Sequence, residues 1–319
     1  MGSPSKCLYC QSMNHEKWIQ FKDMHNEQYQ LDQCNDCGVY FLSPQPSEAQ
    51  LKKAYEESYY GNGDKKFNPL VERVVDWFRA KSSKHFAKRI PENASVLDIG
   101  CGNGSFLVNL GKHCNARLYG LELPGKSAER AAKHNQIQLY QGELKSETYE
   151  ENYFDAIVLT HVFEHLPRPK ETLEIIQKII KSKGILQIEI PNIYSWQARF
   201  FKGNWLHLDP PRHLHFFTPK QLKHELAGFG FECIEENYFS PQFSPFGAQQ
   251  SLLNVLLPKR ELLYEHLKGN RQYTAGYSSF HLFCQQVFHW LSFPFFVLTD
   301  FIASTFSKGA TVKLIFRKQ

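Results

Sequence analysis

Short apolar runs alternate with helix-spaced segments through the middle of the chain. The runs predict strands at 95–99, 117–123, 137–140, 154–160 and 185–190, with helices between them at 104–113, 127–134 and 170–181. A further helix is expected to begin at Thr218 and Pro219, and strands follow at 231–239 and 312–317. Alternation of strand and helix is typical of a doubly wound sheet, so we predict a Rossmann-like α/β domain of seven strands.

Two regions depart from this pattern. Residues 1–46 contain short alternating segments, and residues 47–94 add helices expected at 48–55 and 69–88. Residues 244–309, with a helical candidate at 248–268, separate the last strand from the rest of the sheet. We therefore divide the chain into a module at 1–46, a helical linker or lid at 47–94, the α/β domain at 95–243 and 310–319, and a helical insertion at 244–309.

The insertion contains a long aromatic stretch. Residues 272–299 include no Asp, Glu, Lys or Arg. A transmembrane helix needs about 20 predominantly apolar residues, and Gln285, Gln286, His289 and Pro294 interrupt the run. Three interpretations remain open: a lid over the substrate site, a homodimer interface through residues 272–306, or a peripheral contact with a membrane surface.

Composition narrows the class of protein less than these patterns do. The 319 residues include 37 Lys and Arg against 32 Asp and Glu, and the net charge of +5 is too small to indicate a nucleic-acid partner. The polar amino terminus lacks the apolar core of a signal peptide. The cysteine pattern is typical of a reducing compartment, so we expect a cytoplasmic protein, either free or associated with a membrane.

Four of the eight cysteines form two Cys-x-x-Cys pairs, Cys7 with Cys10 and Cys34 with Cys37. Each pair can bring two thiolates to one ion, and four thiolates complete the tetrahedral shell of a structural Zn²⁺ site. Because such a shell leaves no open position, we assign the predicted zinc to structure rather than catalysis. The spacer between the pairs alternates enough to form short paired strands.

A glycine-rich turn follows the first predicted strand of the α/β domain. Gly100, Gly102 and Gly104 let the chain turn sharply and let a ligand approach the backbone at the amino end of the next helix. Glu122 ends the second strand, where a carboxylate can accept both hydroxyls of a ribose. The turn predicts a cofactor that contains a nucleoside.

These motifs resemble those of the class I S-adenosylmethionine-dependent methyltransferases. Residues 96–106, VLDIGCGNGSF, are similar to the first motif of that family, and the segments ending at Glu122, Leu144, Pro167 and Asn192 resemble the next four. The resemblance covers roughly 95–240 and the last strand, and it implies an S-adenosylmethionine cofactor and an antiparallel seventh strand. It implies cofactor contacts at Asp98, Gly100, Cys101, Gly102, Asn103, Gly104, Glu122, Leu123, Glu143, Leu144, Thr160 and His161. Glu143 departs from the family, which more commonly has Asp at that position.

The resemblance also implies contacts near the methyl group. His161 and His165 would line the pocket near the sulfonium, with capping and loop packing as the alternative. Residues 161–165 also match the H-x-x-E-H zinc-protease motif, which requires both histidines on one helix face; two prolines follow closely, so we reject that interpretation. Helices before the α/β domain often cover the cofactor in this family, so Tyr59 and Tyr60 are candidates for ligand contact or for packing.

A histidine-rich segment follows the fifth predicted strand. His207, Asp209, Arg212, His213 and His215 lie within nine residues, and two consecutive prolines predict a loop. Ligands of open α/β sheets bind beyond the carboxyl ends of strands, where this loop emerges. Methyl transfer to a hydroxyl needs a group that takes the proton, and histidine suits that role near neutral pH.

We assign the base to His213 first, with His215, His207 and Asp209 as orienting or alternative groups. Arg212 is the candidate ligand for an anionic part of the acceptor. A purely structural loop is the alternative, although similar histidine-containing loops occur in the methyltransferase family.

Together the motifs predict an S-adenosylmethionine-dependent methyltransferase that acts on a small, sugar-linked or lipid-linked acceptor, with oxygen as the favoured nucleophile. The order of zinc module, helices and catalytic domain resembles bacterial methyltransferases of polysaccharide and secondary-metabolite pathways. One alternative is an RNA methyltransferase with a zinc module, which the small charge excess disfavours. The other is a non-catalytic binding protein with the same fold, which the intact glycine motif and Glu122 disfavour.

Overall fold

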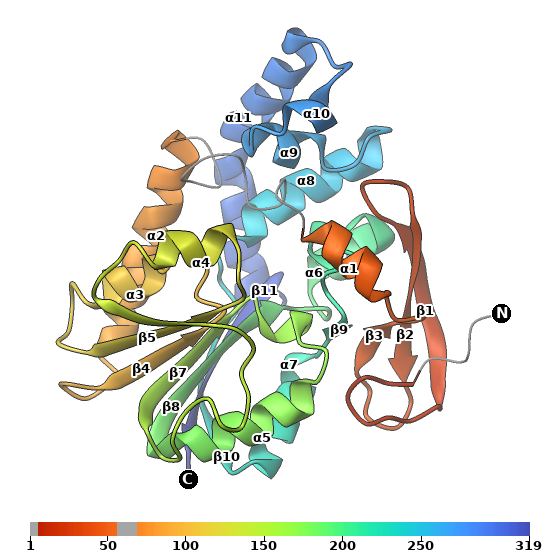
Figure 1. The fold of residues 1–319 in the computed structure, drawn as a ribbon. Coiled ribbons are helices and arrows are strands. Elements are labelled where there is room, and N and C mark those ends of the chain that lie inside the picture. The colour runs from red at the N-terminus through yellow and green to blue at the C-terminus, as the bar shows by residue number, and fades with distance from the viewer. Residues whose placement is uncertain (1–5, 56–68) are drawn as a thin grey trace. The chain divides into compact units, whose positions relative to one another are not determined.

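The computed structural model describes residues 6–55 and 69–319. Two compact units make up the chain, and each is assembled from segments that are separate in sequence (Figure 1). Unit 1 comprises Met1–Glu72, Pro191–Gln221 and Asn237–Val312, and unit 2 comprises Arg73–Ile190, Leu222–Glu236 and Lys313–Gln319. The candidate ligand residues Tyr59 and Tyr60 lie outside the described residues.

Unit 2 is built around a seven-stranded sheet with the strand order β10-β11-β8-β7-β4-β5-β6. Its strands are β4 (Ser95–Ile99), β5 (Arg117–Glu122), β6 (Ile137–Gln141), β7 (Phe154–Thr160), β8 (Ile180–Pro191), β10 (Phe231–Asn237) and β11 (Thr311–Lys318). The strands from β8 to β6 pair in parallel, and β11 is antiparallel. The predicted Rossmann-like sheet is confirmed, although β8 begins at Ile180 rather than at residue 185.

Helices cover both faces of this sheet, because its central strands are apolar on both sides. The helices are α2 (Pro69–Ala87), α3 (Ser105–Leu110), α4 (Lys126–Ala131), α5 (Pro169–Ile179) and α7 (Pro219–Gly228). Figure 1 shows α2, α3 and α4 on one face and α5 and α7 on the other. The predicted cap of α7 is present, since the Thr218 hydroxyl accepts from the Gln221 N–H at 3.2 Å.

Unit 1 contains a four-stranded sheet in the order β1-β2-β3-β9. Its strands are β1 (His15–Lys22), β2 (Gln28–Cys34), β3 (Tyr40–Leu42) and β9 (His215–Phe216). β1 and β2 confirm the strands predicted between the cysteine pairs. β9 corrects the prediction that the whole histidine-rich segment is a loop: His215 pairs with Phe41 and Phe216 with Tyr40, and Phe41 and Phe216 are buried.

The helices of unit 1 are α1 (Glu48–Ala54), α6 (Trp196–Phe201), α8 (Ser244–Leu256), α9 (Leu262–Leu267), α10 (Arg271–Thr274) and α11 (Ser279–Thr305). Three of them, α6, α8 and α11, share a hydrophobic core with the four-stranded sheet. The core contains Phe21 and Leu31 from the sheet, Trp205, Ala248 from α8 and Phe296 from α11.

The helical candidate of the insertion differs from its predicted bounds, and the aromatic segment forms one long helix. The candidate at 248–268 is interrupted between α8 and α9, because Leu257 is extended and the following residue, Pro258, disfavours a helical conformation before it. α11 instead continues through Pro294 and reaches 27 residues.

Candidate functional site

The glycine-rich turn lies at the carboxyl end of β4. Gly100, Gly102 and Gly104 have φ angles of 69°, 58° and 77°, which glycine adopts without the strain that a side chain brings. A Cβ atom at Gly100 would lie 2.4 Å from Cγ2 of Val162, and one at Gly104 would lie 2.7 Å from Cδ1 of Ile137. A Cβ atom at Gly102 would meet no heavy atom within 4 Å, so the backbone there borders open space.

Glu122 is tied to this turn. Its Oε2 accepts a hydrogen bond from the Gly102 N–H at 2.6 Å, and its Oε1 accepts from the Leu123 N–H at 3.1 Å. Burial raises the pKa of Glu122, and the two backbone hydrogen bonds act in the opposite direction. The carboxylate is thus held beside Gly102, the glycine of this turn that borders open space.

Asp98 lies within β4, two residues before the turn begins, and is buried. Burial, followed by the charge of Glu122, raises the pKa of Asp98 well above its usual value. Cys101 is also buried, and Asn103 accepts a hydrogen bond from the Ser105 N–H at 3.2 Å. These side chains support the turn, and their contact with the cofactor stays a prediction.

The strand order brings the other predicted cofactor residues to the same edge of the sheet. Leu123 follows β5, Glu143 and Leu144 follow β6, and Thr160 ends β7. Because β6, β5, β4 and β7 are neighbours and parallel, their carboxyl ends are adjacent. This is where open α/β sheets bind ligands.

His161 leaves the end of β7 in an unusual conformation. Its φ is 53°, its N–H donates to the Glu189 carbonyl at 2.8 Å, and its Nδ1 lies 3.2 Å from the carboxylate of Glu164. Burial by itself lowers the pKa of His161, but the hydrogen bond and charge of Glu164, with the charge of Glu189, outweigh it, so the net shift is upward. Lys313 pairs with Glu189 at 3.1 Å.

Sequence reasoning missed three of these residues, namely Glu164, Glu189 and Lys313. A carboxylate inside an apolar strand was a usable signal for Glu189, and Glu164 is the acidic member of the H-x-x-E-H match. Glu164 and His165 lie in a single 3₁₀ turn, η2 (Phe163–His165). The expectation that no zinc-protease helix forms here is confirmed.

The histidine-rich loop belongs to unit 1. The 3₁₀ turn η3 (Lys202–Asn204) precedes it, and a second, η4 (Leu206–Leu208), begins it. Asp209 ends η4 with a φ of 39°. Both oxygens of Asp209 accept from the Arg212 guanidinium, with the Nε contact at 2.9 Å, and Arg212 also donates to the Ala54 carbonyl at 3.1 Å. The positive charge of Arg212 is therefore compensated by Asp209.

His213 is buried, and a backbone carbonyl orients its ring. Nδ1 of His213 lies 2.8 Å from the carbonyl oxygen of His207, and since a carbonyl only accepts, the proton of the neutral ring belongs on Nδ1. Nε2 then carries the lone pair, 3.7 Å from the Asp209 carboxylate. His215, in contrast, is fully buried within β9.

Glu261 is a further residue that sequence reasoning missed. It is buried, and its pKa is raised to about 7, first by burial and then by the charge of Asp209, while Arg212 acts in the opposite direction. This carboxyl is therefore coupled electrostatically to the histidine-rich loop. In the sequence Glu261 lies between Arg260 and two leucines, and this context does not indicate a contact with the histidine-rich loop.

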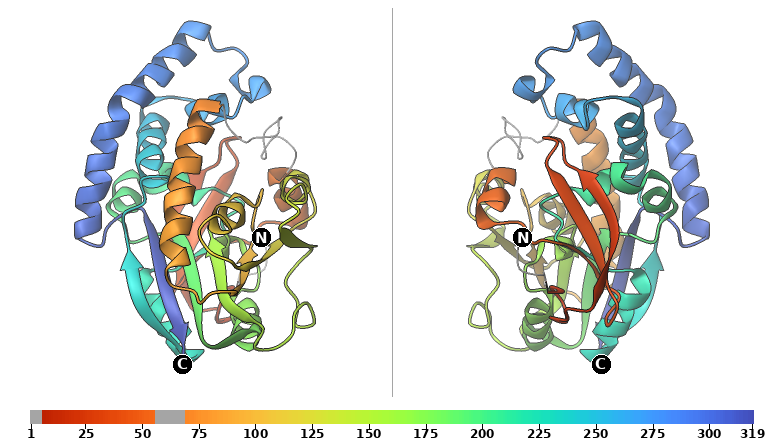
Figure 2. Two further views of the ribbon diagram at one scale, coloured as in Figure 1. Left: turned by 90° about the vertical axis from the view of Figure 1, so that its left-hand side faces the viewer. Right: turned by 90° about the vertical axis from the view of Figure 1, so that its right-hand side faces the viewer.

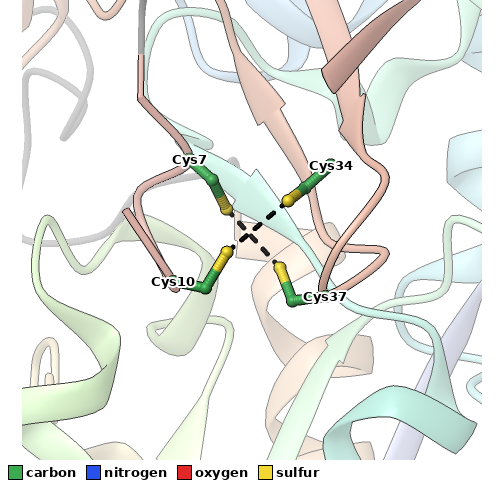
Figure 3. A group of neighbouring side chains, drawn as sticks. All are labelled: Cys7, Cys10, Cys34 and Cys37. Carbon is green, nitrogen blue, oxygen red and sulfur yellow. Dashed lines mark hydrogen bonds between the residues drawn. The ribbon is translucent and has the colours of Figure 1, made fainter. Parts of the chain in front are cut away.

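The four cysteines of unit 1 converge (Figure 3). Their sulfur atoms all lie within 4.8 Å of one another, with Cys7 and Cys37 at 3.6 Å and Cys10 and Cys34 at 3.5 Å. Four ligands about 2.3 Å from a tetrahedral zinc have sulfur–sulfur distances of about 3.8 Å. The arrangement therefore fits a shell of four thiolates.

The backbone supports this convergence. The residue after the second cysteine of each pair is left-handed, with a φ of 62° at Gln11 and 74° at Gly38. Each pair therefore turns sharply toward the other. At the second turn the left-handed conformation falls on a glycine, the residue that adopts it without strain.

Comparison with known proteins identifies the family. The sequence model of the family described as "Methyltransferase domain" matches residues 75–236, just over half of the chain. The chain therefore belongs to this family. Its fold is that of an S-adenosylmethionine-dependent methyltransferase.

Individual relatives are distant. A sterol 24-C-methyltransferase of Gibberella zeae is 26% identical over 114 residues, covering 34% of this chain and 29% of the relative, so the match spans less than a third of that protein. A carboxy-S-adenosyl-L-methionine synthase of Campylobacter jejuni is 25% identical over 242 residues, covering 72% and 88%. A solved structure from Galdieria sulphuraria, described as a candidate sarcosine dimethylglycine methyltransferase, has a TM-score of 0.50 at 13% identity and covers 83% and 94%; it supports the fold alone.

Proposed function

We propose that the protein methylates an oxygen atom of a small sugar-linked or lipid-linked acceptor, with His213 as the base. The observation that carries this proposal is the orientation of His213. The His207 carbonyl fixes the proton of the neutral ring on Nδ1, so Nε2 is the nitrogen that can take a proton from an acceptor hydroxyl.

Bound S-adenosylmethionine supplies an electrophilic methyl group, and Gly100, Gly102 and Glu122 are the residues that would hold it. The acceptor oxygen would receive this methyl group, and S-adenosylhomocysteine would be the other product. Nε2 of His213 takes the hydroxyl proton, and the Asp209 carboxylate 3.7 Å away stabilises the resulting imidazolium.

His161 is the competing base, because Glu164 supports its protonated form in the unit that holds the glycine-rich turn. The test compares His213→Ala with His161→Ala, using His224→Ala on the exposed surface of α7 as the matched control. Each protein is incubated with [methyl-³H]S-adenosylmethionine and a bacterial extract. Label is then counted in the aqueous and the organic-soluble fractions.

We expect His213→Ala to reduce methyl transfer by about 100-fold or more, as removal of a general base does, while S-adenosylhomocysteine still binds. Unchanged transfer by His213→Ala with a large loss in His161→Ala would move the base to His161. The fraction that carries the label assigns the acceptor to the sugar or the lipid class, and a C-methyl or N-methyl product in its NMR spectrum would refute transfer to oxygen.

We also propose that Cys7, Cys10, Cys34 and Cys37 bind one structural Zn²⁺. The convergence of the four sulfur atoms supports this assignment. A filled thiolate shell has no position for substrate, so the ion would stabilise unit 1 and take no part in methyl transfer.

A further inference from the structure

α11 presents its apolar side to solvent. Six of its large apolar residues are more than half exposed, namely Phe280, Phe283, Leu291, Phe295, Leu298 and Phe301, and so is the adjoining Phe306. At 100° per residue these side chains fall within one arc of about 140°. α11 is also long and apolar enough to cross a membrane by length and composition, yet only 17% of its most apolar window is buried.

Three polar residues of α11, Gln285, His289 and Asp300, are buried against the protein instead. His289 Nδ1 pairs with the Gln249 side-chain oxygen at 2.8 Å, and the Gln249 amide donates to the His289 carbonyl at 2.8 Å. Near the other end of the helix, Asp300 accepts from the Ser240 N–H at 3.1 Å. Gln249, His289 and Asp300 are all buried. Crossing a membrane would pull these groups away from their partners, so the helix is built to lie along an apolar phase rather than through it.

The exposed side continues beyond the carboxyl end of α11 onto α6. Trp196 stacks against Phe306 with ring centroids 5.4 Å apart, and Phe200 is 78% exposed. Lys308 Nζ lies 3.4 Å from the centroid of Tyr194, which is half exposed. Figure 2 shows α11 beside α8 on the outer side of unit 1. Tryptophan, tyrosine and lysine together are typical of the water–bilayer boundary.

A second aromatic and cationic cluster lies near the amino end of α11. Lys259 Nζ is 4.1 Å from the ring centroid of Tyr273 and 5.6 Å from that of Tyr277. The acidic residues of α9 and α11, Glu265 and Asp300, are buried. A lysine therefore lies near each end of the helix that carries the apolar stripe.

We propose that this surface, formed by α11 and α6, docks on the anionic surface of a lipid bilayer. The stripe would enter the boundary between headgroups and acyl chains, and the terminal lysines would contact anionic headgroups. Pairing with a second copy is less favourable, because either a parallel or an antiparallel arrangement of two α11 helices brings lysine clusters together. Docking does not depend on the identity of the methyl acceptor.

The test uses the full-length protein and two double variants. Leu291→Glu/Leu298→Glu places two charges on the stripe. Met13→Glu/Ile234→Glu places the same charges at exposed apolar positions outside α11 and α6 and serves as the control. Circular dichroism establishes that all three proteins are folded, and co-sedimentation measures binding to vesicles of phosphatidylcholine alone or with phosphatidylglycerol.

We expect the unmodified protein and the control to bind vesicles that contain phosphatidylglycerol, more weakly at high salt. The stripe variant should bind about 100-fold more weakly, a loss of about 2.8 kcal/mol. Two results would overturn the proposal: an unmodified protein that stays in the supernatant, or a stripe variant that binds as well as the control. A stable dimer in sedimentation velocity that the stripe substitutions dissociate would also overturn it, since a second copy would then cover the stripe.

Discussion

Gly100 and Gly102 lie two residues apart, and the structure predicts that replacing each by alanine has a different main effect. The first substitution should act on stability and the second on cofactor binding. Both have positive φ angles, so each substitution costs about 1–2 kcal/mol of backbone energy. At Gly100 the new methyl group would also lie 2.4 Å from Val162, and overpacking of this kind adds about 1–3 kcal/mol. Gly100→Ala should therefore destabilise the protein by about 2–5 kcal/mol.

Gly102→Ala should lose only the backbone contribution, because no heavy atom lies within 4 Å of the added carbon. The open space is where we place the cofactor, so the methyl group should instead obstruct binding. We expect the affinity for S-adenosylhomocysteine to fall at least tenfold, which is about 1.4 kcal/mol. Gly100→Ala should thus act mainly on stability, and Gly102→Ala mainly on cofactor binding.

The assay combines urea unfolding, followed by circular dichroism, with calorimetric titration of S-adenosylhomocysteine. Val162→Ala in the Gly100→Ala background provides an internal check, since it removes the two methyl groups nearest to the clash. The double mutant should recover at least about 1 kcal/mol relative to additivity. A Gly102→Ala protein that binds the ligand as tightly as the unmodified protein would refute the placement of the cofactor against this turn.

Three further predictions concern other parts of the molecule. Cys34→Ser should reduce bound zinc, measured by mass spectrometry of the metal, to well below one ion per chain, whereas Cys114→Ser, a half-buried cysteine of unit 2, should retain it. Glu261 has a pKa raised to about 7, above its value in the unfolded chain, so the stability it contributes is present in acid and lost as the pH rises through 7. Glu261→Gln should therefore increase the free energy of unfolding by up to about 3 kcal/mol at pH 8 and change it little at pH 5; equal effects at both pH values would contradict this. Glu164→Gln should lower the pKa of His161 in NMR titration, since the carboxylate is what raises it; an unchanged pKa would show that the contact contributes nothing.

The central strands of the α/β domain were predictable because each is a continuous run of mostly apolar residues that is buried on both faces of the sheet. β4 and β7 have the predicted bounds. The two-residue strand β9 was not predictable, because two residues have no period and the pairing partner β3 lies far away in sequence. The contact between His161 and Glu164 likewise depends on a single 3₁₀ turn that leaves no periodic signal.

For the aromatic segment, the sequence could not predict which side of the helix faces the protein. Its spacing reveals an apolar stripe, but periodicity alone cannot say which side of a helix meets the protein. Burial of apolar side chains would ordinarily turn the stripe inward. Here the buried Gln249–His289 pair and the Asp300–Ser240 hydrogen bond fix the opposite orientation, and both contacts join residues at least 40 positions apart.

The reaction itself is tested most directly by incubating the purified protein with [methyl-³H]S-adenosylmethionine and extract, and quantifying both products. The account predicts labelled acceptor and S-adenosylhomocysteine in equal amounts, with both strongly reduced for Gly102→Ala. S-Adenosylmethionine that binds without any transfer of label, or S-adenosylhomocysteine that forms without a methylated acceptor, would contradict the assignment as a methyltransferase.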